Sequence, residues 1–147
     1  MLLLGGLVVG AFDITYACTF WYVKRGVSPV RVLQSVAAGV LGRDSFTGGT
    51  GSAALGLVLH FFIACNVVAF YYLVSGKIAA LVRQPFVFGP LYGLGVYFFM
   101  TYVVVALSRS PQPKSWDWTW FLCSLAVHAL LIGLPAALFA RRARGIS

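Results

Sequence analysis

The chain has 147 residues, of which 61% are hydrophobic and only 10% are charged. A soluble domain of this length has too little interior to bury so much apolar surface, so the composition excludes a soluble globular protein. The formal net charge of +8 comes from basic residues at the ends of apolar stretches, where cations meet anionic lipid headgroups. We therefore expect the lipid bilayer, and no nucleic acid, as a partner of this protein.

Four apolar stretches reach or approach the roughly 20 residues that a helix needs to span the hydrocarbon core. They cover about residues 2–23, 53–75, 86–107 and 118–140. We predict an all-α membrane protein, with residues 1–147 forming one four-helix transmembrane domain. The first stretch has no basic segment before it and continues through Trp21 and Tyr22, so we expect a retained helix and not a cleaved signal peptide.

The connection between the first two stretches carries helix signals of its own. Ser28 followed by Pro29 is typical of a helix N-cap and first position. Apolar residues then recur at helical spacing, with Arg31, Gln34 and Ser35 largely on the other side. We predict a short amphipathic helix over about 29–42 that lies along the membrane surface, as a brace or as a docking surface for a partner. The residues that define this interfacial helix are Ser28, Pro29, Arg31, Leu33, Val36 and Val40.

The later connections are short. A basic segment with Lys77 and Arg83 precedes the third stretch, in which Pro90 falls within the first turn, where proline costs least. The segment SRSPQPKS (108–115) has two prolines and polar residues, and we predict a surface turn there. The fourth stretch opens with WDWTWF (116–121) and contains Pro135, which neighbouring helices can accommodate.

Asp13 is one of only three acidic residues, and it falls inside the first apolar stretch. A carboxylate at such a position costs roughly 2.5–3.5 kcal/mol even on the lenient insertion scale, so a partner must face it. At 1.5 Å per residue, counted from the ends of the helices, other polar side chains fall near the same depth. We predict an intramembrane polar cluster of Asp13, His60 and His128 with Tyr97 or Thr101.

Small residues recur at every fourth position on the same stripes as these polar residues. Such stripes let membrane helices approach closely. The predicted helix-packing glycines are Gly6, Gly10, Gly56, Gly89 and Gly93. Because they share a face with Asp13, His60 and Tyr97, we expect the polar residues to point towards other helices and not towards lipid.

The cluster has four interpretations. It can be a structural polar core in which an Asp–His hydrogen bond sets the helix register. His60 and His128 can be the axial pair of a b-type haem, or both can join Asp13 around a metal ion. Asp13 and a histidine can also form a proton or ion path. No nucleophile–base pair has convincing spacing, so we predict no catalytic residue, and neither a cofactor nor a metal is part of the principal prediction.

Three segments resemble a group of small four-helix bacterial inner-membrane proteins of unassigned function. They are GVSPVRVLQSVAAGVLG (26–42), FTGGTGSAALGLVLHFFIA (46–64) and GPLYGLGVYFFMTYVVVALS (89–108). Members of this group often carry a proline where this chain has Ala106. The resemblance implies a multi-pass protein of the bacterial cytoplasmic membrane, and it transfers no catalytic residue.

The functional prediction is a non-catalytic accessory or stabilising subunit of a larger membrane complex, such as an energy-transducing one. Its grounds are the small extramembrane mass, the glycine stripes, the surface helix and the lack of a catalytic signature. The alternative is a haem- or metal-binding redox protein, or a proton- or ion-conducting protein, that uses Asp13, His60 and His128.

Overall fold

The computed structural model describes residues 1–111 and 115–146 of the chain. Over these ranges it is helical and contains no strand, and four helices are long and apolar enough to cross a membrane. These spans are Leu2–Arg25, Gly49–Ser75, Pro85–Leu107 and Trp118–Ala143. The all-helical fold and the number of long apolar helices are thus as predicted. The predicted turn at 108–115 lies partly outside the described residues.

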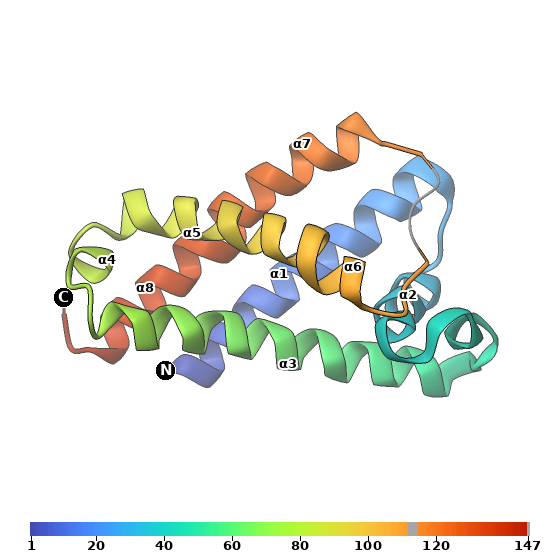
Figure 1. Ribbon diagram of the computed structural model, residues 1–147, viewed down its shortest axis with the longest axis horizontal. Helices are drawn as coiled ribbons and strands as arrows, with labels where there is room; N and C mark the ends of the chain where they lie inside the picture. The colour runs from blue at the N-terminus through green and yellow to red at the C-terminus, as the bar shows by residue number, and fades with distance from the viewer. Residues whose placement is uncertain (112–114, 147) are drawn as a thin grey trace.

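Several spans are divided into shorter elements, and both chain termini lie at the same end of the molecule (Figure 1). The elements are α1 (Leu2–Arg25), α2 (Pro29–Leu41), the 3-10 helix η1 (Gly42–Thr47), α3 (Gly49–Ser75), α4 (Ala80–Arg83), α5 (Pro85–Phe99), the π-helix η2 (Met100–Val104), α6 (Val105–Leu107), α7 (Trp118–Val127), the π-helix η3 (His128–Gly133) and α8 (Leu134–Ala143). The third span is therefore α5–η2–α6, and the fourth is α7–η3–α8.

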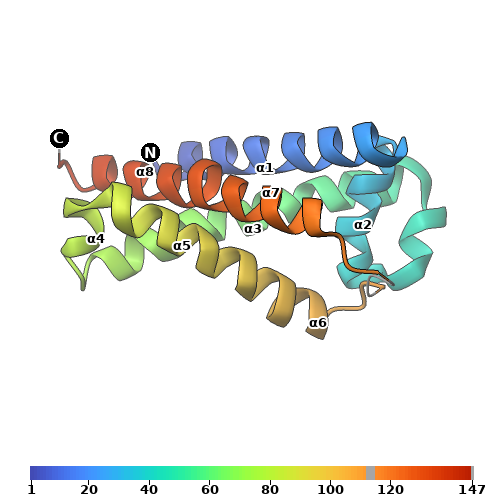
Figure 2. The same cartoon turned by 90° about the horizontal axis from the view of Figure 1, so that it is seen from above.

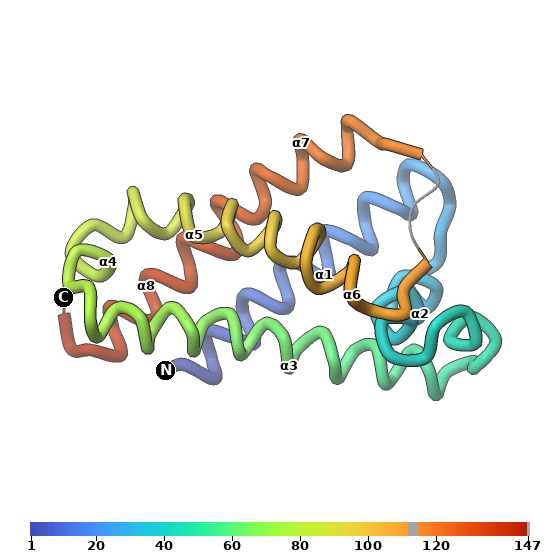
Figure 3. Tube along the Cα trace, in the orientation of Figure 1, coloured from blue at the N-terminus to red at the C-terminus, as the bar shows by residue number. Residues whose placement is uncertain are grey.

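The short helix α2 lies directly against the beginning of α3 (Figure 3). Its N-terminus is capped by the Ser28 hydroxyl, which accepts a hydrogen bond from the Arg31 N–H at 3.3 Å. The close approach of the two helices requires glycine at position 56 of α3, because a Cβ there would overlap the Leu33 carbonyl. Leu33 and Val36 are half-buried, while Val40 is exposed. The inward face of α2 is thus set by α3.

Gln34 corrects one part of the sequence prediction. We expected this side chain on the polar face of α2, but it is buried. Its Nε2 donates hydrogen bonds to the Gly49 carbonyl at 3.0 Å and to Ser52 Oγ at 3.3 Å. The Ser45 hydroxyl in turn donates to the Gln34 carbonyl. The buried side of α2 is therefore partly polar, because it faces the η1 loop and the first turn of α3.

Glycines also bring α1 against α3. A Cβ at Gly6 would lie 2.6 Å from the Cα of Cys65, and one at Gly10 would lie 2.7 Å from the Phe61 ring. Next to this contact is the main apolar core, formed by Val9, Ala64, Val68, Ile132 and Ala136. The first, second and fourth spans thus share one core.

The third span depends chiefly on the fourth. A Cβ at Gly93 would overlap the His128 carbonyl, and one at Gly133 would overlap the Gly89 carbonyl. This crossing coincides with η3, where the Leu134 N–H bonds to the carbonyl of Ala129, five residues earlier. Pro135 follows immediately and lacks an N–H, which gives a physical reason for the widened turn. Beyond the crossing, α5 and α6 diverge from the other spans (Figure 2).

Arg144 joins the end of the fourth span to the end of the second. Its Nε donates a hydrogen bond to Ser75 Oγ at 2.9 Å, and its Nη2 donates to the Tyr72 carbonyl. The guanidinium also lies 4.3 Å from the centre of the Tyr72 ring. A cation at the C-terminus of α3 is favoured by the partial negative charge of the unpaired carbonyls.

We predict that Gly93→Ala destabilises the protein by about 1–3 kcal/mol, because the added methyl group overlaps backbone and not a movable side chain. Gly95→Ala is the matched control, since a Cβ at Gly95 meets no atom within 4 Å, and we expect a change of about 1 kcal/mol or less. Unfolding of the detergent-solubilised protein by SDS measures both. Equal effects of the two substitutions would contradict the close crossing.

Candidate functional site

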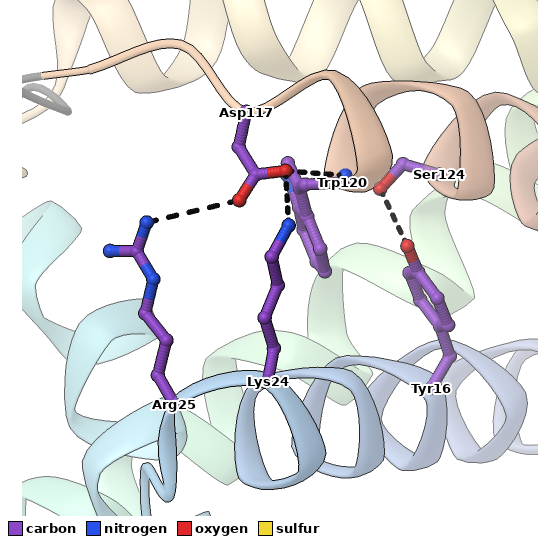
Figure 4. A network of polar contacts seen from close by, with 6 residues as sticks. All are labelled: Tyr16, Lys24, Arg25, Asp117, Trp120 and Ser124. Atoms are coloured by element: carbon purple, nitrogen blue, oxygen red, sulfur yellow. Dashed lines mark hydrogen bonds and ion pairs between the residues drawn. The ribbon is translucent and has the colours of Figure 1, made fainter.

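Several polar side chains of the first and fourth spans lie along one strip between them, which we call the polar seam. Its members are Asp13, Tyr16, Trp21, Lys24 and Arg25 from the first span and Asp117, Trp120, Ser124 and His128 from the fourth or its N-cap. The two helices run antiparallel here, and partners recur every three or four residues on each, which is about one helical turn. Figure 4 shows the outer part of the seam, from Arg25 to Ser124.

Asp117 forms the outer end of the seam, which is the end farther from the chain termini (Figure 1). Its Oδ1 accepts a hydrogen bond from Lys24 Nζ at 2.6 Å and from the Trp120 N–H at 3.0 Å, while Arg25 Nη2 lies 3.8 Å from its Oδ2 (Figure 4). The carboxylate is thus both an ion-pair partner and the N-cap of α7. The hydrogen bond from Lys24, followed by the bond from the Trp120 N–H, lowers the pKa of Asp117 below its usual value of 3.8.

Aromatic rings form the next layer inwards. The Trp120 ring stacks on the Tyr16 ring, with centroids 5.2 Å apart and planes 11° from parallel. The same indole meets Phe20 at 5.0 Å and Trp21 at 5.1 Å. Large rings are needed here because the backbones of α1 and α7 have few close contacts. The layer fills the space between the two helices.

Below the aromatic layer, the side chains of Tyr16 and Ser124 form a hydrogen bond between the two spans. Among the described residues it is the only side-chain hydrogen bond that joins these spans below the layer. The Tyr16 hydroxyl and Ser124 Oγ are 3.0 Å apart, and Ser124 is fully buried. A buried hydroxyl without a partner would be costly, so this bond fixes which turn of α1 faces which turn of α7.

Asp13 and His128 form the inner end of the seam. The Asp13 carboxylate interacts electrostatically with the His128 imidazole, although no hydrogen bond to Asp13 is present in the described part of the chain. His128 Nδ1 lies 2.9 Å from the Ser124 carbonyl. A carbonyl only accepts, so Nδ1 carries a proton and donates it to this bond.

Tyr97 and Thr101 of the third span lie on the other side of His128. The edge of the Tyr97 ring contacts the imidazole, with centroids 5.1 Å apart. Thr101 lies beside the Tyr97 hydroxyl, in η2. The structure therefore places Asp13, His128, Tyr97 and Thr101 in one neighbourhood, with His128 at its centre.

His60 makes a different contact, with the backbone of α1. Its Nε2 is 2.9 Å from the carbonyl of Gly10 and donates to it, so this side chain joins α3 to α1. No hydrogen bond or ion pair connects His60 with Asp13 or His128 in the part of the chain that the structure describes. Gly10 packs against Phe61 and Ala64 of α3, whereas Asp13 interacts electrostatically with His128 of the fourth span.

The positions of the possible ligand side chains can be compared with what a haem or a metal ion requires. Among the described residues, no group of three or more His, Cys, Asp or Glu side chains is arranged so that it could hold a metal ion. Ligation of haem by His60 through Nε2 would require its bond to the Gly10 carbonyl to break. In this arrangement the two histidines make different helix contacts, His60 with Gly10 of α1 and His128 with Ser124 of its own span.

The seam occupies one half of the bundle. From Lys24 to Asp13 it extends over 11 residues of α1, about 16 Å. The remaining part of α1 (2–12) has only apolar residues and glycines, and it packs through Gly6 and Gly10. The arrangement can hold two spans in register and place a carboxylate beside an imidazole, but the polar side chains do not continue to the end where the termini lie.

Sequence reasoning missed several members of the seam. In the sequence, Asp117 is part of the aromatic opening WDWTWF of the fourth stretch, and an Asp before a helical run is also a usual N-cap signal. Tyr16 and Ser124 lie one turn outward from Asp13 and His128, respectively. Antiparallel pairing of the first and fourth stretches, with Asp13 opposite His128, would have predicted both.

Comparison with known proteins adds no further assignment. No family model, curated protein or solved structure matches this chain. The roles given to the residues of the seam follow from their geometry.

We predict that Asp117→Asn lowers the melting temperature above pH 5 and removes part of the acid sensitivity. A carboxylate with a lowered pKa stabilises the fold above its ordinary pKa of 3.8, and this stabilisation is lost as the pH falls through the lower folded-state value. Thermal unfolding monitored by tryptophan fluorescence between pH 7 and pH 2.5 tests this. Asp44→Asn removes the same charge from an exposed position and is the control. Equal pH profiles for the two variants would refute the role of Asp117.

We further predict that Asp13 is coupled to His128 and not to His60. Double-mutant cycles with Asp13→Asn, His128→Gln and His60→Gln should give a coupling energy of about 0.5–1.5 kcal/mol for the first pair, a typical value for polar contacts between membrane helices. For Asp13 with His60 we expect a value near zero. SDS unfolding in detergent provides the free energies. A larger coupling of Asp13 to His60 would show that the seam is wrongly assigned.

Proposed function

We propose that this chain is an integral protein of the bacterial cytoplasmic membrane and acts as a non-catalytic accessory subunit of a larger membrane assembly. Its partners are the lipid bilayer and other membrane protein subunits, and not nucleic acid. Four long apolar helices support the membrane location. The bacterial location rests on the resemblance of residues 26–42, 46–64 and 89–108 to small inner-membrane proteins.

The observation that carries the subunit proposal is the position of Asn66. This side chain is exposed on α3 and has exposed apolar neighbours on the same side, Phe62, Phe70 and Leu73. Its Nδ2 donates to the Phe62 carbonyl at 2.8 Å. Its Oδ1 and its second N–H have no partner among the described residues.

The depth of Asn66 makes this exposure costly. Phe62 is the middle residue of α3 (Gly49–Ser75), so Asn66 lies about one turn, roughly 6 Å, from the centre of the span. Hydrocarbon cannot satisfy an amide, whereas a polar side chain from another membrane helix can, for about 0.6–2 kcal/mol. A neighbouring subunit on this face of α3 therefore explains the residue.

The third span offers a second uncovered surface. It is the least buried of the four spans, and beyond its crossing with the fourth span it diverges from the bundle (Figure 2). Phe98, Phe99 and Tyr102 are exposed there. Such a surface suits contact with helices of another subunit.

The redox or proton-conducting alternative rests on Asp13 and His128. We rank it second, because the polar seam reaches only one end of the bundle, and because His60 is engaged by the Gly10 carbonyl. A structural role in holding the first and fourth spans together accounts for the seam without further components.

The proposal predicts that Asn66→Leu releases the chain from its assembly. After mild solubilisation of native membranes, the wild-type chain should migrate with partner subunits on a native gel, and the variant should migrate largely as a single chain. Val58→Leu, also at an exposed position of α3, is the control and should stay in the assembly. Migration of the wild type as a single chain would refute the subunit proposal.

A further inference from the structure

An apolar groove of about 300 Å³ lies between the end of α3, α4 and α5. Its walls are aliphatic and aromatic side chains, among them Phe70, Val74, Ile78, Leu91 and Tyr92. We propose that this groove binds one acyl chain of an anionic phospholipid whose phosphate is held by Lys77 and Arg83. This inference goes beyond the accessory role and does not depend on it.

The walls of the groove are held in place by hydrogen bonds. The buried Tyr71 donates its hydroxyl proton to the Leu81 carbonyl at 2.9 Å, which ties the α4 segment to α3. Tyr92 donates to the Val67 carbonyl at 2.7 Å, which ties α5 to α3. The Phe70 and Tyr92 rings stack with centroids 6.4 Å apart. A preformed groove needs little ordering when a ligand enters.

Two exposed cations lie close in sequence to residues of the groove wall. Lys77 directly precedes Ile78 of the wall, and Arg83 ends the short helix α4 (Ala80–Arg83). Both are exposed, and neither side chain has a hydrogen-bond or ion-pair partner within 1–111 and 115–146. Arg144, by contrast, is engaged by Ser75 and Tyr72.

The charge at this end of the molecule is unbalanced. The three acidic residues of the sequence are Asp13, Asp44 and Asp117. Asp44 in η1 and Asp117 before α7 lie at the opposite end from α4 (Figure 1), and Asp13 lies within α1. An anion is therefore the complement that Lys77 and Arg83 lack.

The combination of an apolar groove with two exposed cations close to its wall in sequence favours a lipid over other anions. Basic sites at the ends of membrane helices bind anionic headgroups, and each cation contributes a comparable share. Free phosphate would leave the groove unfilled. A zwitterionic lipid would bring its own cation close to Lys77 and Arg83.

Native mass spectrometry of the detergent-solubilised protein tests the proposal, with phosphatidylglycerol, phosphatidylcholine and inorganic phosphate as separate probes. We expect one tightly bound phosphatidylglycerol. Lys77→Gln with Arg83→Gln should weaken its binding about 30-fold, or about fivefold for each cation. Val74→Phe, which fills the groove and leaves both cations in place, should weaken it as well.

Arg43→Gln with Arg109→Gln is the matched control, because both arginines are exposed and lie at the opposite end of the bundle. This variant should bind phosphatidylglycerol like the wild type. Equal loss of binding in the two double variants would show that binding depends only on net charge, and would overturn the proposal. Equal retention of phosphatidylcholine, or displacement of the lipid by inorganic phosphate, would also overturn it.

Discussion

Contact between helix backbones at glycine is the constraint on which the arrangement of the spans depends. At Gly56, Gly93 and Gly133 a single methyl group would overlap a carbonyl of the facing helix. Apolar side chains drive little association between helices in lipid, so close packing of backbones must supply much of the attraction. These contacts set how α2 lies on α3 and how the third span crosses the fourth. The polar side chains then form their contacts within the helix arrangement that these backbone contacts set.

The polar seam is best understood against that background. The crossing at Gly93 places the widened turn η3 beside the third span, and this brings His128 next to Tyr97. The first span has few close backbone contacts with α7, so rings and hydrogen bonds bridge these two helices, and the seam extends from Asp117 to Asp13. Close backbone packing thus joins the third span to the fourth, whereas aromatic and polar side chains join α1 to α7.

Two surfaces are suited to binding other molecules, one because it carries a polar side chain and the other because it forms a groove. Asn66 presents an amide on an apolar face near the middle of α3, and the groove beside α4 ends at Lys77 and Arg83. The two features share Phe70 of α3 but suit different partners, a protein helix and an anionic lipid. Because most of the protein's mass lies in its spans, it has little other surface with which to recognise a partner.

The sequence by itself determined the four apolar helices, the short helix after Ser28 and the presence of polar residues within the spans, because these follow from length, hydropathy and local capping. Only the tertiary structure decided which residues meet. Gln34 is buried since α2 packs on α3 and η1, and His60 bonds to Gly10 while Asp13 faces His128. Depth can be counted along one helix, but the direction of a side chain turns by about 100° per residue. Small differences in helix rotation, set by glycine contacts far apart in the chain, therefore decided the membership of the site.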